Sequence, residues 1–125
     1  MRTGYHSASE SSENYLKAIL ILTQNLGIVR KVDLANYMGF SKASITHGVA
    51  LLQKKGYLEK NRVDIALTEK GLETAERVLE KHRYFTKFLT NCGVEQERAE
   101  REACELEHAV SDESFLRLEE KYQFE

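Results

Sequence analysis

Apolar residues recur every three or four positions along most of this chain, a spacing that predicts helices with one buried face. A helix from Ser41 to Lys55 is one example, with the Ser41 side chain suited to cap its N-terminus. Its apolar positions are Ile45, Val49 and Leu52. The same spacing predicts the other helices at residues 13–26, 33–38, 68–91, 95–110 and 111–122.

Two segments depart from the helical spacing. In residues 57–68, Val63, Ile65 and Leu67 alternate with polar or small residues after a polar tip, which predicts a small β-hairpin. Residues 1–12 are polar and rich in serine without any period, so we predict a flexible N-terminal arm.

The order of these elements indicates a fold class. A helix, a short helix that opens or is capped at Asp33, a tight turn at Gly39, a longer helix and a hairpin follow one another as in a winged helix-turn-helix, whose third helix enters the DNA major groove. We therefore predict a mainly α-helical protein with three parts. They are an arm at 1–12, a winged helix-turn-helix DNA-binding domain at 13–70, and an all-helical region at 71–125.

Composition narrows the class further. The chain has 125 residues, of which 42% are hydrophobic, which suits one modest globular core. The longest apolar run, Ala18 to Leu22, is far shorter than the roughly 18 residues of a membrane span. The N-terminus has no apolar stretch typical of a secretory signal, so we expect a cytoplasmic protein. Its two cysteines, Cys92 and Cys104, are then expected as reduced thiols.

Charge divides the chain. Residues 1–66 contain nine Lys or Arg and five acidic residues, whereas residues 67–125 contain nine and fifteen. A basic first half favours contact with a polyanion. Candidate DNA contacts at the predicted third helix and hairpin are Ser41, Lys42, Ser44, Thr46, His47, Lys54, Lys60 and Arg62. The alternative is that these basic residues are an ordinary solvated surface. Gly48, unfavourable inside a helix, indicates a close approach, which we assign to DNA.

The second half contains a candidate metal site. Cys104, Glu107 and His108 stand at positions i, i+3 and i+4, so a helix presents all three on one face, with Glu100 one turn earlier. Thiolate, carboxylate and imidazole are all ligands of divalent transition metals. His82 adds an imidazole on the apolar face of the preceding helix, where it needs a partner. The alternative is a buried cysteine beside a surface Glu-His pair, with His82 as a hydrogen-bonded core residue. Nothing in the sequence resembles a catalytic constellation, so we expect no enzyme.

With these motifs in view, the chain resembles the diphtheria-toxin-repressor family of iron- and manganese-responsive transcriptional repressors across residues 11–122. The resemblance is strongest in the block from Glu102 to His108 that is followed by Ser111, Asp112 and Glu113. Further matching segments are residues 13–19, 32–58, 67–71 and 81–83.

The resemblance implies a homodimer built on the C-terminal helices, with metal held between those helices and the first helix. By position it implies His82, Cys104, Glu107 and His108 as ligands. Glu100 falls where the iron-responsive members have another histidine ligand, and Asn14 where the family usually has Asp or Met, and both are further candidate ligands. Lys17 and Thr86 depart from the family, because they replace carboxylates of the manganese and iron branches. Since the sequence ends at Glu125, we expect a short form without the SH3-like domain of the iron branch.

Together these features predict a metal-responsive repressor of metal-homeostasis genes that binds a palindromic DNA operator as a homodimer. The thiolate favours Fe²⁺, with Mn²⁺, Co²⁺, Ni²⁺ and Zn²⁺ as other candidates. One alternative is a metal-independent winged-helix regulator in which Lys17 replaces the charge of the ion. A second is a metal-binding or thiol protein on the same scaffold.

Overall fold

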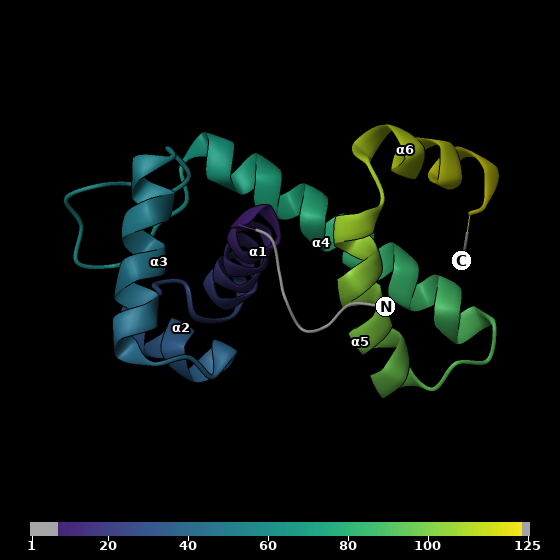
Figure 1. Ribbon diagram of the computed structural model, residues 1–125, viewed down its shortest axis with the longest axis horizontal. Coiled ribbons are helices and arrows are strands. Elements are labelled where there is room, and N and C mark those ends of the chain that lie inside the picture. The colour runs from purple at the N-terminus through teal and green to yellow at the C-terminus, as the bar shows by residue number, and fades with distance from the viewer. Residues whose placement is uncertain (1–7, 124–125) are drawn as a thin grey trace. The chain divides into compact units, whose positions relative to one another are not determined.

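The computed structural model describes residues 8–123, with side chains from Ser11 onward. It is built of helices, in two compact units that divide between Glu76 and Arg77. Figure 1 labels them as α1 (Ala8–Leu26), α2 (Lys31–Met38), α3 (Lys42–Lys54), α4 (Glu69–Asn91), α5 (Gln96–Ala109) and α6 (Asp112–Lys121). No helix within residues 8–123 is both long and apolar enough to cross a membrane.

The N-terminal unit is a bundle of α1, α2 and α3, which pack against one another. Its core consists of the apolar positions that the helical spacing predicted, now fully buried: Leu16, Ile19, Leu34, Ile45 and Leu52. Burial of such side chains is the main driving force for this packing, at roughly 1.5–3 kcal/mol each.

The helix ends confirm some of the expected caps and correct others. Ser41 caps α3, because its Oγ accepts a hydrogen bond from the Ser44 amide at 3.1 Å. Gly39 closes α2 in the left-handed conformation, at φ 71°. The predicted start at Asp33 was wrong, because α2 begins earlier, at Lys31. Asp33 takes part in the cap from the first turn, where its carboxylate accepts from the backbone N–H of Arg30, the N-cap residue, at 2.9 Å.

The first helix starts earlier than its apolar spacing suggested. α1 begins at Ala8, so residues 8–12 are helical and the predicted flexible arm does not extend to Ser12. The first residues of α1 include serines and a glutamate, which are favourable at a helix N-terminus because they bond to its free N–H groups or complement its dipole. A helix can therefore start here without an apolar face. The rest of the predicted arm, residues 1–7, lies outside the described residues.

The predicted hairpin forms a wing that is held by single bridges rather than by strands. Leu58 pairs with Leu67, and Ile65 pairs with Val29 from the connector after α1. The Ile65 amide donates to the Val29 carbonyl at 2.7 Å. The chain reverses its direction near Asn61, whose φ is 60°. Only one residue on each side of this turn, Leu58 and Leu67, forms a bridge across it. No longer strand occurs in the part of the chain that the structure describes.

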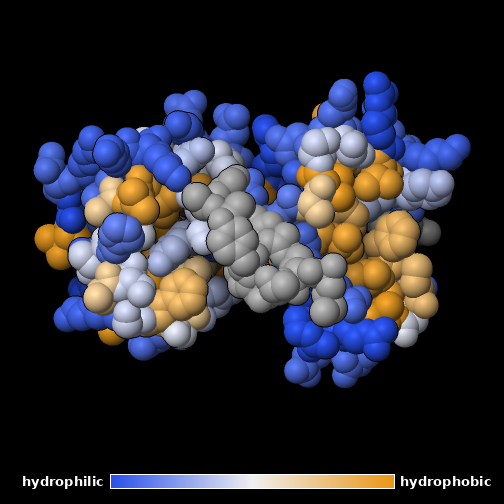
Figure 2. Space-filling view, viewed as in Figure 1, coloured by the Kyte–Doolittle hydropathy of each residue, from blue (hydrophilic) through white to orange (hydrophobic). Residues whose placement is uncertain are grey.

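The C-terminal unit packs α5 and α6 around the second part of α4. Phe85, Ala103 and Phe115 form its buried centre, and Tyr84 meets Phe115 edge-to-face at 5.3 Å between ring centroids. Tyr84 also donates its hydroxyl to the Tyr122 carbonyl at 2.7 Å, which ties the end of α6 to α4. Figure 2 shows apolar residues gathered on one face of this unit, with hydrophilic residues around them.

Candidate metal centre and nucleic-acid interface

The start of α3 presents a row of polar side chains to solvent. Every candidate DNA contact named from the sequence is exposed: Ser41, Lys42, Ser44, Thr46, His47, Lys54, Lys60 and Arg62. The first five lie at the N-terminus of α3 or in its first two turns, Lys54 ends the helix, and the last two lie on the wing. All eight side chains are therefore accessible to a DNA duplex. The contact that each of them makes with DNA stays a prediction.

Three of these side chains, Ser41, Ser44 and Arg62, are already engaged with neighbours. The Ser41 hydroxyl, besides capping the helix, donates to Ser44 Oγ at 3.0 Å. Arg62 forms a two-point ion pair with Asp64, with both N···O distances at 3.0 Å. This pairing raises the pKa of Arg62 and lowers the pKa of Asp64. Asp64 therefore neutralises part of the wing's charge locally, and a phosphate contact by Arg62 has to compete with it.

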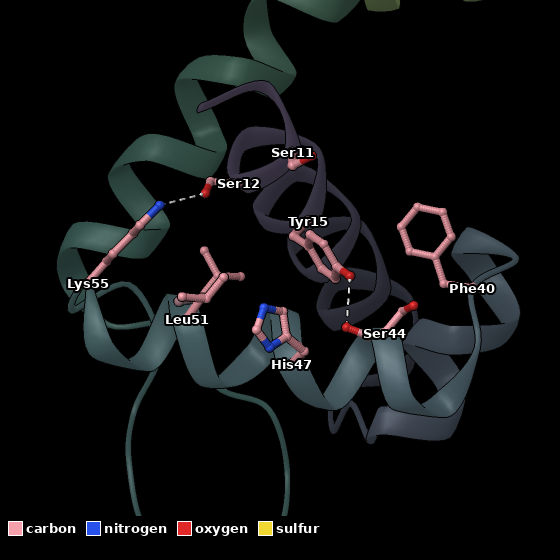
Figure 3. Close-up of a pocket in the computed structure, with 10 residues that line it drawn as sticks. Ser11, Ser12, Tyr15, Phe40, Ser44, His47, Leu51 and Lys55 are labelled. Atoms are coloured by element: carbon pink, nitrogen blue, oxygen red, sulfur yellow. Dashed lines mark hydrogen bonds between the residues drawn. The ribbon is translucent and has the colours of Figure 1, made fainter. Parts of the chain in front are cut away.

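Gly48 makes its close approach inside the protein. A Cβ at position 48 would lie 2.6 Å from Cζ of Tyr15, a buried residue of α1. Our assignment of that approach to DNA is thereby corrected: the neighbour that excludes a side chain is the tyrosine ring. In Figure 3 the Tyr15 ring lies between α1 and α3, at a pocket of about 430 Å³ that His47 and Leu51 also line.

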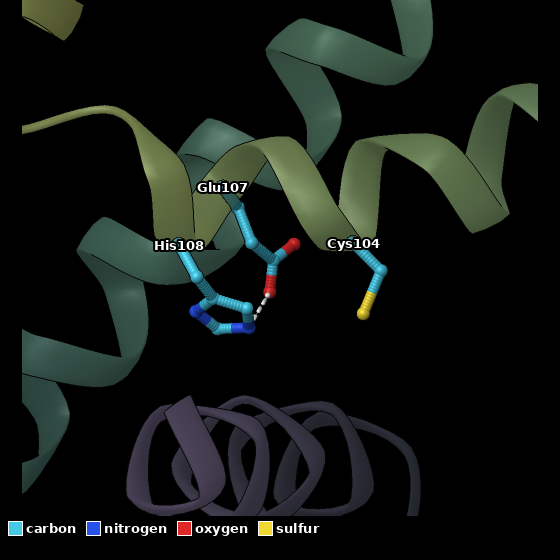
Figure 4. A group of neighbouring side chains, drawn as sticks. All are labelled: Cys104, Glu107 and His108. Atoms are coloured by element: carbon cyan, nitrogen blue, oxygen red, sulfur yellow. Dashed lines mark ion pairs between the residues drawn. The ribbon is translucent and has the colours of Figure 1, made fainter. Parts of the chain in front are cut away.

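The C-terminal unit brings the predicted metal ligands of α5 together. One ligand atom from each of Cys104, Glu107 and His108 can be chosen so that all lie within 4.8 Å of one another. Figure 4 shows the thiol, the carboxylate and the imidazole projecting from the same side of α5. The i, i+3, i+4 spacing therefore produces the shared face that it predicted.

Glu107 is the centre of this cluster. Its side chain is fully buried and lies between two imidazoles. Its Oε1 is 2.8 Å from His82 Nδ1, and its Oε2 is 3.2 Å from His108 Nε2. The partner that His82 needed on the apolar face of α4 is thus the Glu107 carboxylate. Each imidazole that donates to this carboxylate keeps its second nitrogen for another contact.

The remaining candidate ligands are Glu100 on the same helix and Asn14 in the N-terminal unit. Glu100 is exposed, lies outside the cluster, and accepts a hydrogen bond from Gln96 at 3.2 Å. Asn14 is half-buried on α1 in the N-terminal unit. Thr86, which occupies the position of a family carboxylate, donates its hydroxyl to the His82 carbonyl at 2.8 Å. Ligation by Glu100 and Asn14 stays a prediction.

The donor set fits a divalent transition metal. A thiol, a carboxylate and imidazoles suit Fe²⁺, Co²⁺, Ni²⁺ and Zn²⁺, while a hard ion such as Mn²⁺ is served better by oxygen ligands. The two imidazoles supply hydrogen bonds to the fully buried carboxylate, and a cation beside Glu107 would compensate its charge further. The cluster therefore suits a metal in chemistry and in burial.

A buried lysine near this site has no counterpart among the sequence predictions. Lys81 precedes His82 on α4, and its Nζ donates to the carbonyl of Val110, the C-cap residue of α5, at 2.8 Å. The same Nζ lies 2.8 Å from Asp112 Oδ1, and Arg77 Nη1 lies 2.8 Å from Oδ2. Hydrogen bonds from Lys81 and Arg77 lower the pKa of Asp112. These contacts fasten the ligand-bearing end of α5 to the helix that carries His82.

An exposed polar helix with a wing in one unit, and a cluster of candidate metal ligands in the other, define the class of metal-responsive DNA-binding regulators. Comparison with protein families agrees for both units. Residues 7–63 match the iron dependent repressor N-terminal DNA-binding domain, and residues 68–124 match the iron dependent repressor metal binding and dimerisation domain. The chain therefore belongs to the iron-dependent repressor family, as the resemblance in its sequence predicted.

Relatives are found along nearly the whole chain. It is 36% identical over 113 residues to an uncharacterized HTH-type transcriptional regulator, MJ0568, of Methanocaldococcus jannaschii, covering 88% of this chain and 90% of the relative. It is 31% identical over 116 residues to the HTH-type transcriptional regulator MntR of Bacillus subtilis, covering 91% of this chain and 81% of the relative.

Solved structures agree on the fold. The T. acidophilum IdeR structure matches with a TM-score of 0.77 and 28% identity, over 99% of this chain and 56% of that one. The metal-dependent transcriptional regulator MtsR matches with a TM-score of 0.79 and 26% identity, over 87% of this chain and 52% of that one. The chain thus spans about half the length of these solved chains. The predicted mainly helical class, with a DNA-binding unit followed by a helical unit, is confirmed.

Proposed function

We propose that this chain is a homodimeric transcriptional repressor that binds a palindromic DNA operator when a divalent transition metal occupies the cluster on α5. The observation that carries the proposal is the meeting of Cys104, Glu107 and His108 in a chain whose α3 presents polar and basic side chains to solvent. A protein that acts on DNA in this way is expected in the cytoplasm.

For the metal, we propose a site formed by Cys104, Glu107 and His108 and assisted by His82, whose Nδ1 contacts the Glu107 carboxylate. Glu100 and Asn14 are further candidate ligands. The thiol favours Fe²⁺ over Mn²⁺, although the relatives include a structure described as a manganese-dependent transcriptional repressor in complex with manganese. Thr86 and Lys17, in place of family carboxylates, support one bound ion per chain rather than two.

For the DNA, we propose that Lys42, Ser44 and His47 contact base edges and that Lys54 and Lys60 contact phosphates. Ser41, Thr46 and Arg62 complete the proposed interface. Two such units about 34 Å apart are needed to reach successive major grooves on one side of a duplex. An apolar face on the C-terminal unit supports a second copy as the partner that covers it. Leu116 and Tyr122 of this unit are large apolar side chains that remain exposed.

A gel-shift assay with and without metal tests this function. Because the operator is unidentified, the probe is a duplex selected from random DNA by the Fe²⁺-loaded or Co²⁺-loaded protein. We expect a retarded complex with metal, its loss on adding a chelator, and its return when excess metal is added. Equal binding with and without chelator would contradict metal control and favour the metal-independent regulator. No sequence-specific binding in either condition would contradict the repressor function itself.

A further inference from the structure

The Tyr15 side chain of α1 contacts the turn before α3 and two successive turns of α3 itself. The Tyr15 ring lies 6.0 Å from the Phe40 ring in the turn before α3. Its hydroxyl donates to the Ser44 carbonyl at 3.3 Å, and its far edge lies where a Cβ of Gly48 would be. Phe40, Ser44 and Gly48 are four residues apart, so the ring lies along one side of the turn and the first two turns of α3 (Figure 3).

The glycine at position 48 serves this contact by leaving space. Inside a helix, glycine costs about 1 kcal/mol relative to alanine, so its presence needs a reason. Gly48 lies within α3 and has no positive φ, which excludes a conformational reason. A Cβ would come within 3.0 Å of three ring atoms of Tyr15, counting its hydroxyl oxygen. A shift of the ring away from this Cβ would disturb its packing against Phe40 and its hydrogen bond to Ser44, and Tyr15 is only 9% exposed.

We infer that Tyr15 is a positioning residue for DNA recognition, which sets how α3 lies against α1, and that Gly48 is the partner this role requires. This inference rests on the proposed binding of DNA by α3. Base contacts depend on hydrogen-bond geometry and tolerate only small displacements of a helix, whereas lysines reach phosphates through long flexible chains. A displaced α3 therefore loses sequence preference while it keeps most of its general attraction to DNA.

Substitutions at both positions test this inference. Gly48→Ala adds the Cβ that meets the ring. Tyr15→Leu removes the ring atoms that this Cβ meets, and Tyr15→Phe is the matched control because it keeps Cζ and removes only the hydroxyl. The two double variants complete the set. Each protein is titrated with a duplex selected from random DNA by the wild type and with a scrambled duplex of the same length, and its thermal unfolding is recorded.

We expect Gly48→Ala to weaken binding to the selected duplex by at least about tenfold, as for the loss of one good base contact, and to the scrambled duplex by less than about twofold. Tyr15→Leu alone is expected to reduce the ratio between the two affinities. In the Tyr15→Leu background, adding Gly48→Ala changes that ratio by less than about twofold and raises the unfolding temperature, as helix propensity predicts. In the Tyr15→Phe background the loss caused by Gly48→Ala persists.

Three results would overturn the inference. One is unchanged selectivity in Gly48→Ala. Another is the same loss from Gly48→Ala in the Tyr15→Leu background, since the added methyl would then clash with DNA or another group. The third is a higher unfolding temperature for Gly48→Ala in the wild-type background. If Gly48→Ala alone fails to fold, folding of the double variant with Tyr15→Leu still supports the clash. A wild type that selects no DNA sequence contradicts the proposed function and not the contact.

Discussion

Replacing Glu107 by glutamine separates its contacts with two imidazoles from its proposed role as a metal ligand. Glutamine keeps the shape of the side chain but removes the charge. The carboxylate is fully buried, 2.8 Å from His82 Nδ1 and 3.2 Å from His108 Nε2. The amide can still bond to both rings if one imidazole changes its tautomer to accept from the amide nitrogen.

The size of the effect follows from these two contacts. A hydrogen bond to a charged group contributes about 1.5–3 kcal/mol, and a neutral one about 0.5–1.5 kcal/mol. Losing roughly 1 kcal/mol at each contact lowers the free energy of unfolding by about 2 kcal/mol without metal. The proposed role as a metal ligand is tested when metal is added: a ligand at 100 times its Kd stabilises the wild type by about 2.7 kcal/mol. Glu107→Gln is expected to lose most of that gain, because the amide is a much poorer ligand.

Thermal unfolding with and without Co²⁺ measures both effects, at about 3–5 °C per kcal/mol for a chain of this size. Glu105→Gln is the matched control, because Glu105 is an exposed carboxylate on the same helix outside the cluster. We expect the control to unfold near the wild-type temperature and to keep its full metal-induced shift. The reasoning is refuted if Glu107→Gln keeps the same shift, or if it matches the control without metal.

Three further outcomes are expected. Lys54→Ala should weaken binding to all DNA sequences alike and lower the slope of log affinity against log salt by about one, in salt titrations; a changed sequence preference would instead indicate a base contact. Gly71→Ala should lower the free energy of unfolding by about 1–3 kcal/mol in urea, because its Cβ would overlap the Tyr57 carbonyl; an unchanged midpoint contradicts this. Because Lys81 lowers the folded-state pKa of Asp112, the ion pair between them stabilises the protein above pH about 3.9, and this stabilisation is lost as the pH falls through the folded pKa. Asp112→Asn should therefore lower the free energy of unfolding at pH 7 and lower it progressively less in more acidic buffer. A difference that does not depend on pH would argue against the ion pair.

The sequence predicted those features that depend on local spacing. The apolar faces of the helices, the Ser41 cap and the Gly39 turn all depend on residues a few positions apart. The same holds for the shared face of Cys104 and His108, which helical geometry dictates once α5 forms. Local patterns therefore located the element order and the centre of the candidate site.

Features that depend on packing between distant segments could not be predicted in this way. The alternation of Ile65 indicated a strand, but its partner proved to be Val29, far away in the sequence. The excluded space at Gly48 was detectable, yet only the packing of α1 against α3 identifies the ring that fills it. Lys81 gave no signal, because a lysine is normally exposed and its burial depends on where α5 and α6 join.

The most direct test of the metal-responsive account is an optical titration with Co²⁺. If Cys104, Glu107 and His108 hold the ion, the wild type should bind it with a thiolate-to-metal charge-transfer band, and that band should vanish in Cys104→Ala. His108→Ala should bind Co²⁺ more weakly, and both variants should lose metal-dependent retardation of the selected duplex. An unchanged cobalt spectrum and stoichiometry in both variants would contradict the account, and would leave a regulator that works without metal as the better description.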